Sequence, residues 1–155
     1  MKKTTTVFLA IVFFAVSAAF AADGLSVGGS LDVNMGSNMN PYGSGSLNIE
    51  YRPFSMVSIG FKISGQTNFN DRFSAVPSVF ARLYPFSGAF AEGSIGGSFS
   101  WANKVTSKNM SAGASIGWRI TAGNTYIEPK INMDYVFGAA EPYSWSAGVG
   151  AGYSF

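Results

Sequence analysis

The sequence predicts an all-β fold, an eight-stranded antiparallel up-and-down transmembrane β-barrel. Three observations predict it. Apolar and small polar residues alternate with a period of two in eight stretches, the connections alternate between short and long, and the charged residues avoid the apolar face. We expect one barrel domain over residues 22–155, preceded by a signal peptide at residues 1–21, because 155 residues suffice for a single domain.

The clearest stretch is residues 143–155, at the end of the chain. One parity carries Trp145, Ala147, Val149, Ala151, Tyr153 and Phe155, and the other carries only Ser and Gly. Aromatic residues at both ends of an apolar band are typical of a strand that crosses a bilayer, because their rings favour the headgroup levels. A half-buried strand of a soluble sandwich would alternate in the same way. Other stretches of the sequence are therefore needed to distinguish a membrane strand from a sandwich strand.

The first residues have the three-part pattern of a secretory signal peptide. Lys2 and Lys3 are followed by an apolar run over residues 7–16, and Ala19 and Ala21 supply the small residues of a cleavage site after Ala21. A permanent helical anchor would need ~20 apolar residues, more than this segment provides. The absence of Cys from the sequence excludes both a lipoprotein anchor and a disulfide framework.

Seven earlier stretches repeat the alternation of the last one. Together the eight predicted strands cover residues 25–35, 47–52, 57–64, 78–84, 91–101, 111–120, 126–137 and 143–155, with Pro77 near the start of the fourth. The turns at 53–55, 85–88 and 122–123 are short and contain Pro or Gly, as turn chemistry requires. The connections at 35–43, 65–74, 102–109 and 138–142 are longer, which is the asymmetry of an outer-membrane barrel.

The face opposite the apolar one distinguishes a membrane barrel from a soluble sandwich. In a sandwich that face meets water and should be rich in charged residues, whereas here it is mostly Gly and Ser. Ten charges lie on it, five of each sign: Asp32, Glu50, Arg52, Lys62, Arg82, Glu92, Arg119, Glu128, Lys130 and Asp134. Balanced charges suit a closed interior, because an unpaired buried charge costs several kcal/mol. A turn at 85–88 that sets Tyr84 opposite Phe90 would also set Arg82 directly opposite Glu92.

These features resemble the small eight-stranded outer-membrane barrels, similar to the OmpA transmembrane domain and OmpX. The resemblance covers the whole chain after the leader and rests on strand number, alternation, rim asymmetry and the Tyr153-Ser154-Phe155 ending. It implies a bacterial outer-membrane location with both termini in the periplasm and outer-membrane lipid around the barrel. It also implies that Tyr153 and Phe155 form a C-terminal signal for the barrel-assembly machinery, and that the protein is a monomer.

Few residues of the sequence are of the types that catalyse reactions or bind metals. Without His or Cys, it lacks the catalytic arrangements of barrel acyltransferases and proteases, so we expect no enzyme, no cofactor and no metal site. Lys2 and Lys3 account for the whole excess of ten basic over eight acidic residues, so nothing indicates a nucleic-acid partner. We expect Glu50, Glu92 and Glu128 to lie near Arg82, Arg119 and Lys130 as a plug. A narrow channel for small solutes or hydrophobic molecules is the alternative, and a lipid-modifying enzyme the third reading.

Overall fold

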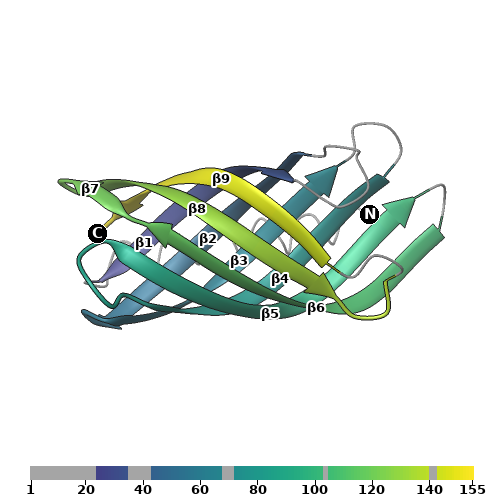
Figure 1. The fold of residues 1–155 in the computed structure, drawn as a ribbon, viewed down its shortest axis with the longest axis horizontal. Coiled ribbons are helices and arrows are strands. Elements are labelled where there is room, and N and C mark those ends of the chain that lie inside the picture. Colours follow the sequence, from purple (N-terminus) through teal and green to yellow (C-terminus); the bar gives the residue numbers. More distant parts are fainter. Residues whose placement is uncertain (1–23, 35–42, 68–71, 103–104, 140–142) are drawn as a thin grey trace, which may run out of the picture.

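The fold is a closed antiparallel β-barrel in the computed structural model, which describes residues 24–34, 43–67, 72–102, 105–139 and 143–155 (Figure 1). Its strand segments are β1 (Leu25–Asn34), β2 (Gly43–Phe54), β3 (Val57–Thr67), β4 (Arg72–Leu83), β5 (Ala89–Ala102), β6 (Val105–Trp118), β7 (Ile120–Ala122), β8 (Thr125–Val136) and β9 (Tyr143–Ser154). The predicted signal peptide, with Ala19 and Ala21, lies outside the described residues.

Consecutive strands pair antiparallel, except that β6 and β7 do not pair with each other, and the first strand closes the barrel by pairing with the last. β1 lies antiparallel to β9, with Val27 opposite Tyr153 and Val33 opposite Ala147. β6 and β7 both pair with β8 in one register, from Gly117↔Lys130 to Ile120↔Ile127, so they form a single interrupted strand. The predicted eight-stranded up-and-down barrel is therefore confirmed.

Several predicted strand ends were wrong, because the strands run further toward the long-connection rim than predicted, most clearly in β4 and β6. β5 and β6 pair as far as Ala102↔Val105, where the sequence predicted a connection over 102–109. β4 begins at Arg72, so Pro77 lies inside the strand, and the β4–β5 ladder omits positions 76 and 77. Pro lacks a backbone N–H, which explains the local loss of pairing. These strand ends stay paired through backbone hydrogen bonds, which do not depend on an apolar face.

The barrel is apolar outside and polar inside. Large exposed hydrophobic side chains cover the outer face, among them Leu31, Leu47, Ile116 and Val149, with Leu31 79% exposed. Buried side chains of the described residues are mostly Ser, Asn and charged groups, joined by four aromatic rings: Phe80, Tyr84, Phe90 and Tyr126. This is the reverse of a soluble sandwich, as the distribution of charges predicted.

Aromatic side chains lie on the outer face at both rims, as the sequence predicted. Tyr51, Phe54, Phe86, Trp118 and Tyr153 are exposed near the short turns, whereas Trp101, Phe137 and Trp145 are exposed near the long connections. Gly88 (φ 85°) and Gly123 (φ 62°) occupy the left-handed region in two of the short turns. Such turns need a residue without a Cβ, so the predicted turn chemistry is confirmed there.

Within the described residues, no helix is both long and apolar enough to cross a membrane.

Inward-facing glycines accommodate the buried rings. A Cβ built on Gly60 would lie 2.3 Å from the carbonyl oxygen of Ile49 and 2.4 Å from the ring of Phe80, so one of them would have to move. Gly117 faces Phe90 and Gly152 faces Tyr126 in the same way. The buried rings therefore fill the space that these glycines leave.

We expect Gly60→Ala to lower the free energy of unfolding by about 1–3 kcal/mol, because overpacking of a filled interior forces the backbone or ring to shift. Urea unfolding of the barrel in lipid vesicles, followed by tryptophan fluorescence, would measure the change. Gly93→Ala is the matched control, because a Cβ at Gly93 would meet no atom within 4 Å. Equal losses in the two variants would contradict the steric explanation.

Candidate functional site: the charged interior of the barrel

Arg82 is the centre of the charged interior. Its Nε donates to Glu92 Oε2 at 2.6 Å, and its Nη1 donates to Glu50 Oε2 and to Glu128 Oε1, both at 3.0 Å. The guanidinium therefore holds three carboxylates from β2, β5 and β8, and its side chain is 1% exposed. Arg82 and Glu92 are direct cross-strand partners, as predicted from a register that sets Tyr84 opposite Phe90.

Arg119 provides the second guanidinium of this arrangement. It lies between β6 and β7, and its Nε and Nη2 donate to Glu128 and Glu50, the same carboxylates that Arg82 contacts. Its backbone N–H donates to the carbonyl of Gly88 in the β4–β5 turn at 2.6 Å. The interruption between β6 and β7 thus places Arg119 against both the charged interior and a rim turn.

Lys62 and Arg52 extend the cluster at its edges. The Nζ of Lys62 donates to Glu92 Oε1 at 2.7 Å. Arg52 Nη2 lies 3.7 Å from Glu50 Oε1 without a hydrogen bond. We call the set that these ion pairs join the lumen plug: Glu50, Arg52, Lys62, Arg82, Glu92, Arg119 and Glu128.

A second, smaller polar cluster lies further toward the long-connection rim. Lys130 Nζ is 3.8 Å from Asp32 Oδ1, which also accepts a hydrogen bond from Asn132 Nδ2 at 2.9 Å. Ser30 donates to the other oxygen of Asp32 at 2.8 Å. Gly148 permits this arrangement, because a Cβ there would overlap Asp32.

The expectation that Lys130 belongs with the glutamates was incorrect. Lys130 pairs with Gly148 of β9, which in turn pairs with Asp32 of β1, so the barrel register brings the lysine to Asp32 instead. Asp134, further along β8, has no ion pair within 4 Å among the described residues. Nine of the ten predicted lumen charges are therefore paired, in two groups, and their role as a functional site stays a prediction.

Aromatic side chains contact the plug residues, a role that the sequence did not predict. The hydroxyl of Tyr84 donates to Glu50 Oε1 at 2.7 Å. The guanidinium of Arg82 lies 4.6 Å from the centroid of Phe90, and that of Arg119 lies 4.1 Å from the centroid of Tyr126. Such contacts stabilise cations that have little access to water. The sequence did contain a sign of this role, because these large rings lie on the strand face that otherwise carries mostly small residues.

Several buried polar atoms have no hydrogen-bond partner, and the three that belong to asparagines lie beyond the plug. Among the described residues these atoms belong to Asn34, Asn48, Arg52, Ser58, Tyr126 and Asn132. Buried polar groups in proteins are nearly always satisfied, often by water. The part of the lumen lined by Ser and Asn therefore has the chemistry of a hydrated space, whereas every plug residue except Arg52 has a hydrogen bond to an opposite charge.

The interior offers ion pairing and no recognisable catalytic or metal-binding arrangement. Across the ranges that the structure describes, no group of three or more His, Cys, Asp or Glu residues could hold a metal ion. The three glutamates of the plug are occupied by guanidinium and ammonium groups. This arrangement can hold strands together and obstruct a passage.

The last strand has the geometry expected of its position, although its predicted signal is untested. Tyr153 and Phe155 place their rings 5.0 Å apart, and the backbone N–H of Phe155 donates to the carbonyl of Leu25 at 2.9 Å. The C-terminal residue thus ends the seam between β9 and β1. Recognition of this end by an assembly machinery stays a prediction.

Comparisons with known proteins give structural matches only. No family model matches the chain, and no curated protein matches it. Neisserial surface protein A matches with a TM-score of 0.60 at 14% identity, covering 86% of this chain and 98% of that one. Ail of Yersinia pestis matches with a TM-score of 0.55 at 13% identity, covering 86% and 100%.

The N-terminal β-barrel domain of Pseudomonas aeruginosa OprF gives a third match. Its TM-score is 0.52 at 15% identity, and the alignment covers 86% of this chain and 98% of that domain. Identities this low establish the fold and leave the activity open. The chain has the architecture of the small eight-stranded outer-membrane β-barrels, as the sequence resemblance implied.

Proposed function

We propose that this protein is a small bacterial outer-membrane β-barrel with a plugged lumen, serving a structural or surface-interaction role. The observation that carries the proposal is the placement of the buried, paired charges of the lumen plug inside a barrel whose outer face is apolar. An apolar outer face with aromatic residues at both rims is the surface that a bilayer requires.

The plug supports a structural role because it connects strands across the lumen. Glu50 comes from β2, Lys62 from β3, Arg82 from β4, Glu92 from β5 and Glu128 from β8, with Arg119 at the end of β6. An eight-stranded barrel has an interior just wide enough for side chains to fill it. Side chains that are both interlocked and nearly inaccessible therefore close the passage and hold opposite walls together.

The membrane environment and the partners belong to the same proposal. Outer-membrane lipid surrounds the exposed Leu31, Leu47 and Val149, and the short turns and both termini of the chain face the periplasm. The barrel-assembly machinery reads the C-terminal strand with Tyr153 and Phe155, and the protein acts as a monomer. No enzymatic step belongs to this function, since the chain has no His or Cys to support one.

A narrow channel is the second candidate, and one observation favours it. The unpartnered buried atoms of Asn34, Asn48 and Asn132 indicate water in the part of the lumen beyond the plug. If the plug rearranged, this hydrated part would connect with the periplasmic rim. The two candidates therefore differ in whether the plug interrupts ion flow.

We expect wild-type protein in planar bilayers to give no resolved conductance steps, and Arg82→Ala/Glu92→Ala to conduct, because both changes remove volume and charge from the plug. Single-channel recording measures this directly. Lys108→Gln removes an exposed charge elsewhere on the barrel and serves as the control. Wild-type steps equal to those of the double variant would exclude a plugged lumen and favour the channel.

A further inference from the structure

A pocket of about 570 Å³ opens at the short-turn rim, where the lumen plug approaches the surface. Its walls come from the β2–β3 turn, the β4–β5 turn and the interruption between β6 and β7. A volume of this size falls within the range of small-molecule sites.

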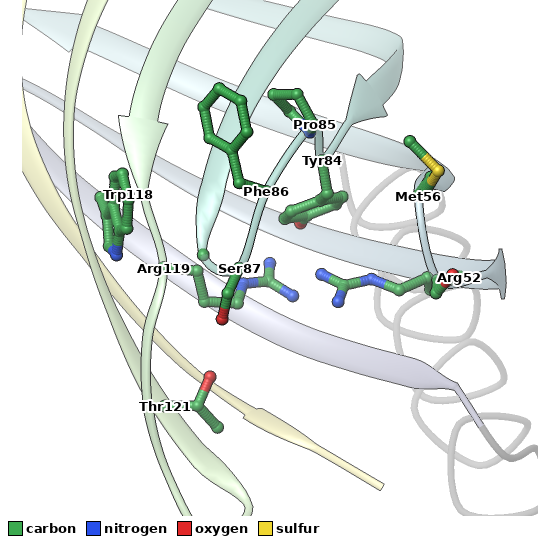
Figure 2. Close-up of a pocket in the computed structure, with 11 residues that line it drawn as sticks. Arg52, Met56, Tyr84, Pro85, Phe86, Ser87, Trp118, Arg119 and Thr121 are labelled. Carbon is green, nitrogen blue, oxygen red and sulfur yellow. The ribbon is translucent and has the colours of Figure 1, made fainter.

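Two guanidinium groups converge in this pocket. Figure 2 shows those of Arg52 and Arg119 pointing toward one another beneath the ring of Tyr84. Both lie against this ring, at 3.8 Å from its centroid for Arg52 and 5.5 Å for Arg119. Both guanidinium groups also contact Glu50, Arg119 through a hydrogen bond and Arg52 at 3.7 Å, so the two cations share one carboxylate. A second anion bound between them would add the negative charge that one carboxylate does not supply to two cations.

The charge balance of the lumen plug leaves one cation in excess at this place. The plug contains four cations, Arg52, Lys62, Arg82 and Arg119, against the three carboxylates of Glu50, Glu92 and Glu128. Arg82 and Arg119 donate hydrogen bonds to these carboxylates, whereas the buried Nη2 of Arg52 has no hydrogen-bond partner. Arg52 is therefore the donor that a ligand would complete.

The remaining lining residues indicate which anion would fit. Ser55, Ser87 and Thr121 supply hydroxyl donors near the two arginines, which together suit a phosphate group with several acceptor oxygens. Met56, Phe86 and Trp118 add apolar side chains that are exposed at the rim, with Met56 and Trp118 on opposite sides of the pocket (Figure 2). A polar cradle bordered by such side chains matches an ester that joins a phosphate to an apolar group.

We propose that the rim pocket is a binding site for a phosphate ester, with the phosphate held between Arg52 and Arg119 and the esterified group along Met56, Phe86 and Trp118. A glycerophospholipid of the surrounding leaflet and a water-soluble phosphate ester both present this chemistry. The site uses the outer edge of the plug, and it does not depend on whether the lumen conducts.

The test is a titration of the refolded full-length barrel in maltoside micelles, which carry no phosphate, followed by NMR of the arginine side-chain N–H groups and of the backbone amides of Ser87, Gly88 and Thr121. One arm adds dihexanoyl phosphatidylglycerol, and the other adds glycerol 3-phosphate. We expect saturable shifts in at least one arm. Arg52→Gln should weaken that binding about tenfold or more, the usual effect of removing a charged hydrogen-bond donor.

The control variant is Lys108→Gln, which removes one exposed positive charge from the part of β6 nearest the opposite rim and should leave binding unchanged. Shifts with the lipid alone would assign the site to a membrane phospholipid, and shifts with glycerol 3-phosphate alone would assign it to a soluble ester. Absence of saturable shifts in both arms, or equal binding by wild type and Arg52→Gln, would overturn the proposal. A heat-dependent change of gel migration verifies that each variant is folded.

Discussion

Arg82→Met is expected to lower the free energy of unfolding by about 3–5 kcal/mol, the usual cost of removing one partner from a buried ion pair. Arg82 donates to Glu50, Glu92 and Glu128 at once, so its loss leaves three buried carboxylates with Arg119, Lys62 and the distant Arg52 as their remaining cations. Urea unfolding in lipid vesicles, followed by tryptophan fluorescence, measures the change. The folded band on an unheated detergent gel should also be lost at a lower temperature.

Two further variants separate charge from packing at this position. Arg82→Met/Glu92→Gln removes one carboxylate charge together with the guanidinium, and it should recover part of the lost stability because fewer charges stay unpaired. Lys108→Met removes an exposed cation outside the plug and should have little effect. If Arg82→Met unfolded at the same urea concentration as wild type, the plug would not stabilise the barrel.

Val149→Arg is expected to lower the free energy of unfolding in lipid vesicles by about 2–4 kcal/mol, the cost of a cation at the bilayer midplane. Val149 is 57% exposed on the outer face of β9, midway between Trp145 and Tyr153, so its side chain meets the centre of the hydrocarbon layer. The same urea titration measures the change.

The matched control for the membrane-facing surface is Phe54→Arg. Phe54 ends β2 at the short-turn rim and is 71% exposed, so an arginine there would reach the headgroup region at a cost of about 0–1 kcal/mol. A dependence on depth of this kind would distinguish lipid contact from ordinary packing. Equal losses at the two positions would contradict the membrane placement of the apolar face.

Most of the architecture could be predicted because a transmembrane strand has a simple pattern. Alternation with a period of two identifies both the strand and its two faces, and a register that sets Tyr84 opposite Phe90 also pairs Arg82 with Glu92. The strand ends near Ala102 and Arg72 were misjudged because pairing continues there through backbone hydrogen bonds, which do not require an apolar face.

The site was only partly predictable, because its contacts join residues that are distant along the chain. Glu50 and Arg119 are 69 positions apart, and only closure of the barrel brings them into contact. The partner of Lys130 proved to be Asp32 for the same reason, since the β9 strand lies between them. Alternation places a side chain inside the barrel without specifying its height or its partner across the lumen.

The sequence by itself determined which residues face lipid and which face the lumen, because the side-chain period of a strand is a local property of the backbone. The tertiary structure alone decided how the ten lumen charges divide: seven in the plug, with Arg52 as its excess cation at the rim, a separate Lys130–Asp32 pair, and Asp134 without an ion pair among the described residues. The physical reason is that strand tilt and register set the height of each side chain in a closed barrel, and ion pairing depends on that height.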